Sequence, residues 1–161
     1  LILGPTHPET LNSANNLATV LWGLGRHEEA ASLLVTVLEA RTTVLGADHP
    51  LTLQSGNNLA ATLPPARAVP VLREVVAGSD RVLKIDNLHS LIAQRSLASG
   101  LYTIGELEEA RELATHVLDG FLELLGPDHQ EARDIADFLT TVNRDIAIRA
   151  AARTWEGLAD G

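Results

Sequence analysis

Apolar and small residues return along the chain at the spacing of an α-helix. Two segments, 8–24 and 27–44, each place these residues on one stripe, which is the pattern of a helix that buries one face. Gly25 lies between the segments, and glycine commonly ends a helix. The pattern predicts two antiparallel helices joined by a tight turn. We expect Leu17, Ala18 and Leu21 of the first segment to pack between helices.

This pattern is repeated 42 residues later. Residues 3–18 read LGPTHPETLNSANNLA, and residues 45–60 read LGADHPLTLQSGNNLA, so most positions are identical. A fixed period of about 20–50 residues is typical of proteins built from stacked repeats. The chain is therefore expected to consist of copies of one helix pair.

Two further copies follow, at offsets of 80 and 122 from the first. The third copy has lost the Gly-x-x-His-Pro opening, and Asp86 or Asn87 is expected to cap its first helix instead. In the fourth copy, no glycine or proline interrupts residues 130–156, which predicts one long helix that ends the stack. We therefore predict about seven helices in a single domain over residues 1–161, with repeats at about 4–45, 46–83, 84–125 and 126–161, the last one incomplete.

The second copy departs from the pattern at its turn. Four residues are missing there, and Pro64-Pro65 fill the gap. Pro70 lies inside the expected second helix of this copy, where proline removes a backbone hydrogen bond. Either this helix is kinked at Pro70 or it begins late, and we expect a late beginning near Val69.

Composition limits the classes of function. The chain has 161 residues, 45% of them apolar, no cysteine and a net charge of −9. Disulfides and thiolate chemistry are thereby excluded, and the negative charge argues against nucleic acid and anionic membrane surfaces as partners. No signal peptide and no apolar run of about 18–20 residues is visible, so we predict a cytoplasmic protein. The first residues match the end of a repeat, so we expect a piece of a longer protein.

Three motifs at this period carry a resemblance to a known family. They are Gly-x-x-His-Pro-x-Thr-Leu, Asn-Asn-Leu-Ala and Gly-x-x-Glu-Glu-Ala. Together they resemble the tetratricopeptide repeats of kinesin light chain and of many bacterial proteins with the same long repeat. The resemblance covers nearly the whole chain. It implies an all-α fold, a right-handed superhelical solenoid of antiparallel helix pairs, with a concave groove lined by the first helix of each pair.

The first helix of each pair leaves one polar face for that groove. An asparagine amide both donates and accepts hydrogen bonds, so it suits the backbone of an extended peptide. In the family, asparagines at this place contact bound peptides, which points to Asn16 and Asn58, with Asn15 and Asn57 beside them. The candidate peptide-binding residues are Asn12, Asn15, Asn16, Thr19, Trp22, Gln54, Asn57, Asn58, Arg95, Ser99 and Tyr102.

Three of these candidates offer a different chemistry from the amides. Arg95 is the clear cation in the middle of the predicted groove, and its fork is suited to a carboxylate. Trp22 and Tyr102 are candidate anchors for a partner. The alternatives are structural: Trp22 as a half-buried packing residue, and the amides as hydrogen-bond partners of a neighbouring repeat.

His7, His49 and His129 recur at one position of the repeat and suggest a metal site at first sight. Equivalent residues in successive copies are separated by more than one helix diameter, about 8–10 Å. Zinc ligands lie about 2.0–2.1 Å from the metal. We therefore expect these histidines to start helices, and we predict no metal and no other cofactor. No sequence motif of a hydrolase, a P-loop or a zinc peptidase is present, so no enzymatic activity is predicted.

The sequence favours a non-catalytic protein-interaction module. Its groove would hold an extended or helical segment of a protein partner, or a segment of its own parent chain. Neither nucleic acid nor a membrane is an expected partner. The alternative is a sensor or regulatory region of a larger signalling ATPase or transcriptional regulator, which packs against its own neighbours or self-associates as a homo-oligomer.

Overall fold

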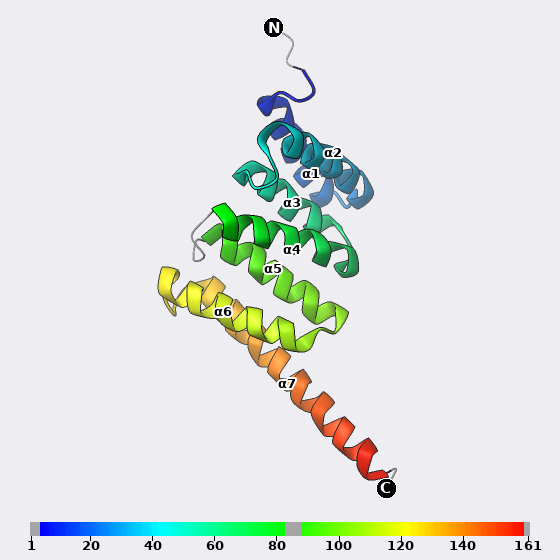
Figure 1. The fold of residues 1–161 in the computed structure, drawn as a ribbon, viewed down its shortest axis with the longest axis vertical. Coiled ribbons are helices and arrows are strands. Elements are labelled where there is room, and N and C mark those ends of the chain that lie inside the picture. The colour runs from blue at the N-terminus through cyan, green and yellow to red at the C-terminus, as the bar shows by residue number, and fades with distance from the viewer. Residues whose placement is uncertain (1–3, 83–87, 160–161) are drawn as a thin grey trace. The chain divides into compact units, whose positions relative to one another are not determined.

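The computed structural model of the protein describes residues 4–82 and 88–159, with side chains described as far as residue 155. All regular structure in these ranges is helical (Figure 1). The helices are α1 (Pro8–Gly23), α2 (His27–Leu45), α3 (Pro50–Thr62), α4 (Pro65–Val82), α5 (Leu88–Ile104), α6 (Leu107–Leu125) and α7 (Gln130–Ala159).

The chain forms two compact units, residues 1–93 and 94–161. In the first unit, α1 packs against α2, α2 against α3, and α3 against α4, and α1 also touches α3. In the second unit, α6 packs against α7. This consecutive packing confirms the predicted all-α fold of helix pairs, including the long last helix. The single domain over residues 1–161 stays a prediction.

The core of the first unit contains a leucine that reaches from one helix pair into the preceding one. Leu59 of α3 is 5% exposed and packs with Ala18 and Leu21 of α1 and with residues of α2. Its equivalent in the first repeat, Leu17, is 52% exposed, so the prediction that Leu17 packs inward is wrong. The reason is that, among the described residues, no helix pair precedes α1 to receive this side chain.

Three histidines begin helices, as the repeat pattern predicts. The Nδ1 atom of His7 accepts a hydrogen bond of 3.2 Å from the backbone N–H of the residue two positions later, and His49 and His129 do the same. The donor is thus one of the N–H groups that a helix leaves unsatisfied at its start. The expected caps at Asp86 and Asn87 lie outside the described residues.

Removing one of these caps is expected to lower stability. His49→Ala deletes the acceptor for the Leu51 N–H and should reduce the free energy of unfolding by about 1 kcal/mol, the usual loss for a helix cap. Urea unfolding followed by circular dichroism measures the change. His49→Asp is the matched control, because aspartate is itself a favoured cap. Equal stability of the alanine and aspartate variants would contradict a capping role.

Helix α4 begins earlier than predicted. It starts at Pro65 and includes Pro70, so the late beginning near Val69 is wrong. Proline is well suited to the first helical position, and the carbonyl of Pro64 accepts the N–H groups of Arg67 and Ala68. Pro70 removes one hydrogen bond to the turn before it. Because Pro70 and Ala66, whose carbonyl loses this bond, are both exposed, water can satisfy the freed carbonyl.

Candidate functional site

A buried arginine joins the first two repeats. Arg41 of α2 is 1% exposed. Its Nη1 donates to the Leu51 carbonyl and to Ser55 Oγ, both at 2.7 Å, and its Nη2 donates to Asn12 Oδ1 at 2.6 Å. Within the described ranges no carboxylate pairs with it, and burial lowers the pKa of this guanidinium. Neutral oxygen acceptors therefore hold a buried cation between α1, α2 and α3.

Two candidate groove residues belong to this junction. Asn15 is 6% exposed, and its Oδ1 accepts a hydrogen bond of 3.2 Å from Asn58 Nδ2. Asn12 is half-buried and accepts from Arg41. The predicted placement of Asn15 on the open groove face is wrong, because the α3 helix of the next repeat covers this amide. The structural alternative, an amide bonded to a neighbouring repeat, describes Asn15, whereas Asn12 is bonded to Arg41 of its own repeat.

The other amides of the first unit lie at the surface. Asn16 and Gln54 are exposed, and Asn57 and Asn58 are half-buried. In the described part of the chain, no side-chain hydrogen bond engages Asn16, Gln54 or Asn57. We call Asn16, Gln54, Asn57 and Asn58 the amide face. It offers carbonyl acceptors and N–H donors from α1 and α3, and within the described residues only Asn58 has a side-chain partner, Asn15.

Thr19 and Trp22 lie on α1 near this face. Thr19 is exposed, and its hydroxyl donates to the backbone carbonyl of Asn15 at 3.3 Å. Trp22 is 48% exposed, and its ring meets that of His27 edge to face with the centroids 6.0 Å apart. About half of the indole is thus covered, while the rest remains open to a partner.

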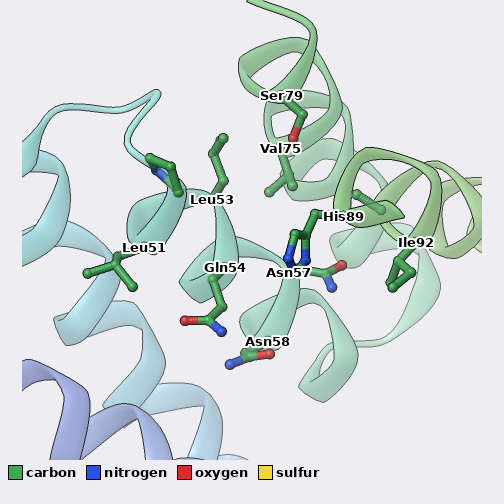
Figure 2. Close-up of a pocket in the computed structure, with 11 residues that line it drawn as sticks. Leu51, Leu53, Gln54, Asn57, Asn58, Val75, Ser79, His89 and Ile92 are labelled. Atoms are coloured by element: carbon green, nitrogen blue, oxygen red, sulfur yellow. The ribbon is translucent and has the colours of Figure 1, made fainter. Parts of the chain in front are cut away.

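A hollow of about 380 Å³ opens beside the amide face (Figure 2). Figure 2 shows Gln54, Asn57 and Asn58 along α3, with Val75 and Ser79 on α4 and His89 and Ile92 on α5. Buried apolar side chains of all three helices, Leu53, Val75 and Ala93, pack together at its wall. The lining residues are Pro50, Leu51, Leu53, Gln54, Asn57, Asn58, Val75, Ser79, His89, Ile92 and Ala93, and none of them is Asp, Glu, Lys or Arg.

The sequence prediction missed Ser79, Val75 and His89 in this hollow. It considered the first helix of each pair, whereas Ser79 and Val75 belong to the second helix of the second repeat. The repeat alignment held a signal for Ser79, because this small residue takes the place that Arg41 has in the first repeat.

Two of the three predicted residues of the second unit, Arg95 and Tyr102, already have partners within the chain. Arg95 forms an ion pair with Glu131, so its guanidinium already has one carboxylate partner within the chain, and its role in holding a partner's carboxylate stays a prediction. The Tyr102 hydroxyl donates to Asp145 Oδ2 at 2.6 Å, and this hydrogen bond lowers the pKa of Asp145 and raises the pKa of Tyr102. The Tyr102 ring packs on Phe138 at 5.5 Å. Ser99 is exposed.

The consecutive helix pairs, the histidine caps and the repeated asparagines define a helical repeat protein. The tetratricopeptide repeat profile matches residues 10–51 and 91–131, more than half of the chain, so the chain belongs to the tetratricopeptide repeat family. Such repeats are generally protein–protein interaction modules on a non-catalytic scaffold. In the described ranges, no helix is long and apolar enough to span a bilayer, and no three His, Asp or Glu residues are grouped to hold a metal ion.

Solved structures relate these repeats to the tetratricopeptide repeats of kinesin light chain. The chain is 27% identical to a putative kinesin light chain with nearly identical TPR-like repeats from Podosopora anserina, with a TM-score of 0.78 over 94% of this chain and 74% of that chain. A variant of the same protein gives a TM-score of 0.79 at the same identity and coverage. BtubC (BKLC) from P. vanneervenii shares the fold at 15% identity, with a TM-score of 0.65 over 86% of this chain and 65% of that chain. The repeats are therefore kinesin light chain-like. No protein with a curated description matches the sequence.

Proposed function

We propose that the first unit binds an extended segment of a partner protein along the amide face. The observation that carries the proposal is the set of surface amides on α1 and α3 with no partner of their own in the described residues, Asn16, Gln54 and Asn57. A polypeptide backbone needs a donor and an acceptor at each residue, and an amide side chain provides both.

The hollow and Trp22 add side-chain contacts to this backbone recognition. Each amide–backbone hydrogen bond contributes only about 1 kcal/mol net. A peptide held by three or four such bonds alone would bind weakly, because association also costs translational and rotational freedom. Filling the hollow beside Asn57 and Asn58 provides the additional burial that a specific partner needs.

The test begins with peptides selected from a random display library on the whole 161-residue chain. For the tightest peptide, Asn16→Ala and Asn57→Ala are each expected to raise Kd about five- to tenfold, the equivalent of one hydrogen bond or slightly more. Fluorescence anisotropy measures Kd, and an unchanged thermal midpoint shows that the fold is intact. Asn143→Ala, at an exposed asparagine of α7, is the matched control and should leave Kd unchanged.

Selection of no peptide, or peptides whose Kd ignores both variants, would contradict the proposal. The alternative of a region that packs on other helix pairs has one observation in its favour: Leu17 and Val20 of α1 and Leu24 at its end are exposed apolar residues, 52–68% exposed. Leu17→Asp separates the two functions, because it disrupts this group of apolar residues and leaves the amide face in place. Loss of peptide binding in Leu17→Asp but not in Asn57→Ala would favour the alternative.

A further inference from the structure

The hollow lies where another repeat of the same chain has a guanidinium group. The second helices of the first three repeats align at Ala30, Ala68 and Ala110, all of them buried. The same alignment makes Val37, Val75 and Val117 equivalent, and their side chains are 1%, 5% and 0% exposed. Eleven positions after each alanine, the three repeats carry Arg41, Ser79 and Phe121.

The position that Arg41 occupies in the first repeat carries a different side chain in each of the three repeats. Arg41 extends into the junction between α1 and α3, as described above. Phe121 is the equivalent residue of the second unit, and it is 0% exposed. Ser79 is too short to fill it, and the hollow opens there.

The Ser79 hydroxyl itself is poised toward the hollow. The residue is 3% exposed, and among the residues that the structure describes none forms a hydrogen bond with its hydroxyl. Figure 2 shows this oxygen pointing from α4 toward the hollow. A hydroxyl oxygen accepts hydrogen bonds, so an occupant of the hollow that donates to Ser79 would gain one.

The acceptors that hold Arg41 also have counterparts here. Gln54 of α3 is equivalent to Asn12, and Asn57 is equivalent to Asn15, with the amides of both lining the hollow. His89 of α5 occupies the position of Leu51, whose backbone carbonyl accepts from Arg41. Ala93 replaces Ser55, so this one acceptor is lost, but the Ser79 hydroxyl adds another. The site therefore keeps a set of neutral oxygen acceptors around an unfilled space.

We propose that this hollow binds a guanidinium group, supplied by an arginine side chain of the partner segment. The inference rests on the proposed function, because the partner segment is the one that lies on the amide face. A guanidinium donates five N–H groups in a planar fork and accepts none, which matches a site lined by oxygen acceptors. Arg41 is the precedent within this chain for a guanidinium held by neutral acceptors alone.

Charge and solvent access favour the same ligand. The chain carries a net charge of −9, which attracts a cationic segment at long range. Gln54 and His89 at the hollow are exposed, so a guanidinium there keeps part of its hydration and loses less than the fully buried Arg41 does. A lysine ammonium is a compact, strongly hydrated point charge, so it suits a flat set of acceptors less well than arginine.

The test uses N-acetyl-argininamide as the probe, titrated into the whole chain and followed by NMR. We expect chemical-shift changes at the side-chain amides of Gln54 and Asn57. We also expect a Kd at least about fivefold lower than that of N-acetyl-citrullinamide, which has a similar shape without the charge. Ser79→Arg places a guanidinium in the hollow from α4 and should abolish binding of the probe. Ser32→Arg, at an exposed serine of α2, adds the same charge elsewhere and is the matched control.

Equal Kd values for the arginine and citrulline probes, or binding that persists in Ser79→Arg, would overturn the proposal. If Ser79→Arg fails to fold, Gln54→Leu serves in its place, because it removes an acceptor at an exposed position. The probe contains no peptide segment, so its binding tests the hollow independently of the amide face. Display-selected peptides that respond to Asn16→Ala, but bind equally well with arginine replaced by citrulline, would retain the proposed function and overturn the arginine site.

Discussion

Arg41→Ala is expected to lower the free energy of unfolding by about 3 kcal/mol, the largest effect of any single change considered for this chain. The substitution leaves the buried Ser55 Oγ and the half-buried Asn12 Oδ1 without this donor, and a buried acceptor that loses its partner costs about 1–3 kcal/mol. It also opens a cavity between α1, α2 and α3. The gain from no longer burying a cation, whose pKa burial already lowers, offsets part of this loss.

Urea unfolding followed by circular dichroism measures this effect. Arg41→Lys keeps the charge but lacks the planar fork, so it is expected to lose about half as much. Arg67→Ala, at an exposed arginine of α4, is the matched control and should stay within about 0.5 kcal/mol of the parent chain. A loss below about 1 kcal/mol for Arg41→Ala would show that the junction does not depend on this guanidinium.

The fold was predictable from sequence because its signals are local and repeated. The spacing of apolar residues, the His-Pro openings and the glycines between helices each act within a few residues, and they recur in successive repeats. The start of α4 escaped prediction because two prolines gave opposite signals. Pro65 at the first helical position fixed the start, and the exposed Pro70 was tolerated inside the helix.

The candidate site was less predictable because it depends on contacts between repeats. Asn15 and Asn16 are adjacent in sequence and identical in type, yet Asn15 is buried by α3 and Asn16 is exposed. Nothing in the local sequence separates them. Arg41 reads as a solvated residue near the end of a helix, and its burial arises from a backbone carbonyl and a hydroxyl ten and fourteen positions away. Similarly, the ion pair of Arg95 joins residues 36 positions apart.

The second large effect is expected at Gly56, where α3 and α4 approach each other closely. A Cβ atom added at Gly56 would lie 2.6 Å from Val75 Cγ2, a distance at which the two atoms overlap. Val75 is buried and β-branched, so its side chain has little freedom to move away. Gly56→Ala gains about 1 kcal/mol of helix propensity but is expected to lose about 3 from overpacking, for a net loss of about 2 kcal/mol.

Two further variants separate this clash from a general effect of glycine replacement. Gly23→Ala meets no atom within 4 Å and should be neutral or stabilising by up to about 1 kcal/mol. Val75→Ala removes the methyl group that the new Cβ would strike, so Gly56→Ala should cost at least about 1 kcal/mol less in a Val75→Ala background than alone. If the stability losses of Gly56→Ala and Val75→Ala simply add in the double variant, the loss at Gly56 does not arise from its contact with Val75. Because Val75 also lines the hollow, the same double variant should enlarge that space while restoring the approach of α3 to α4.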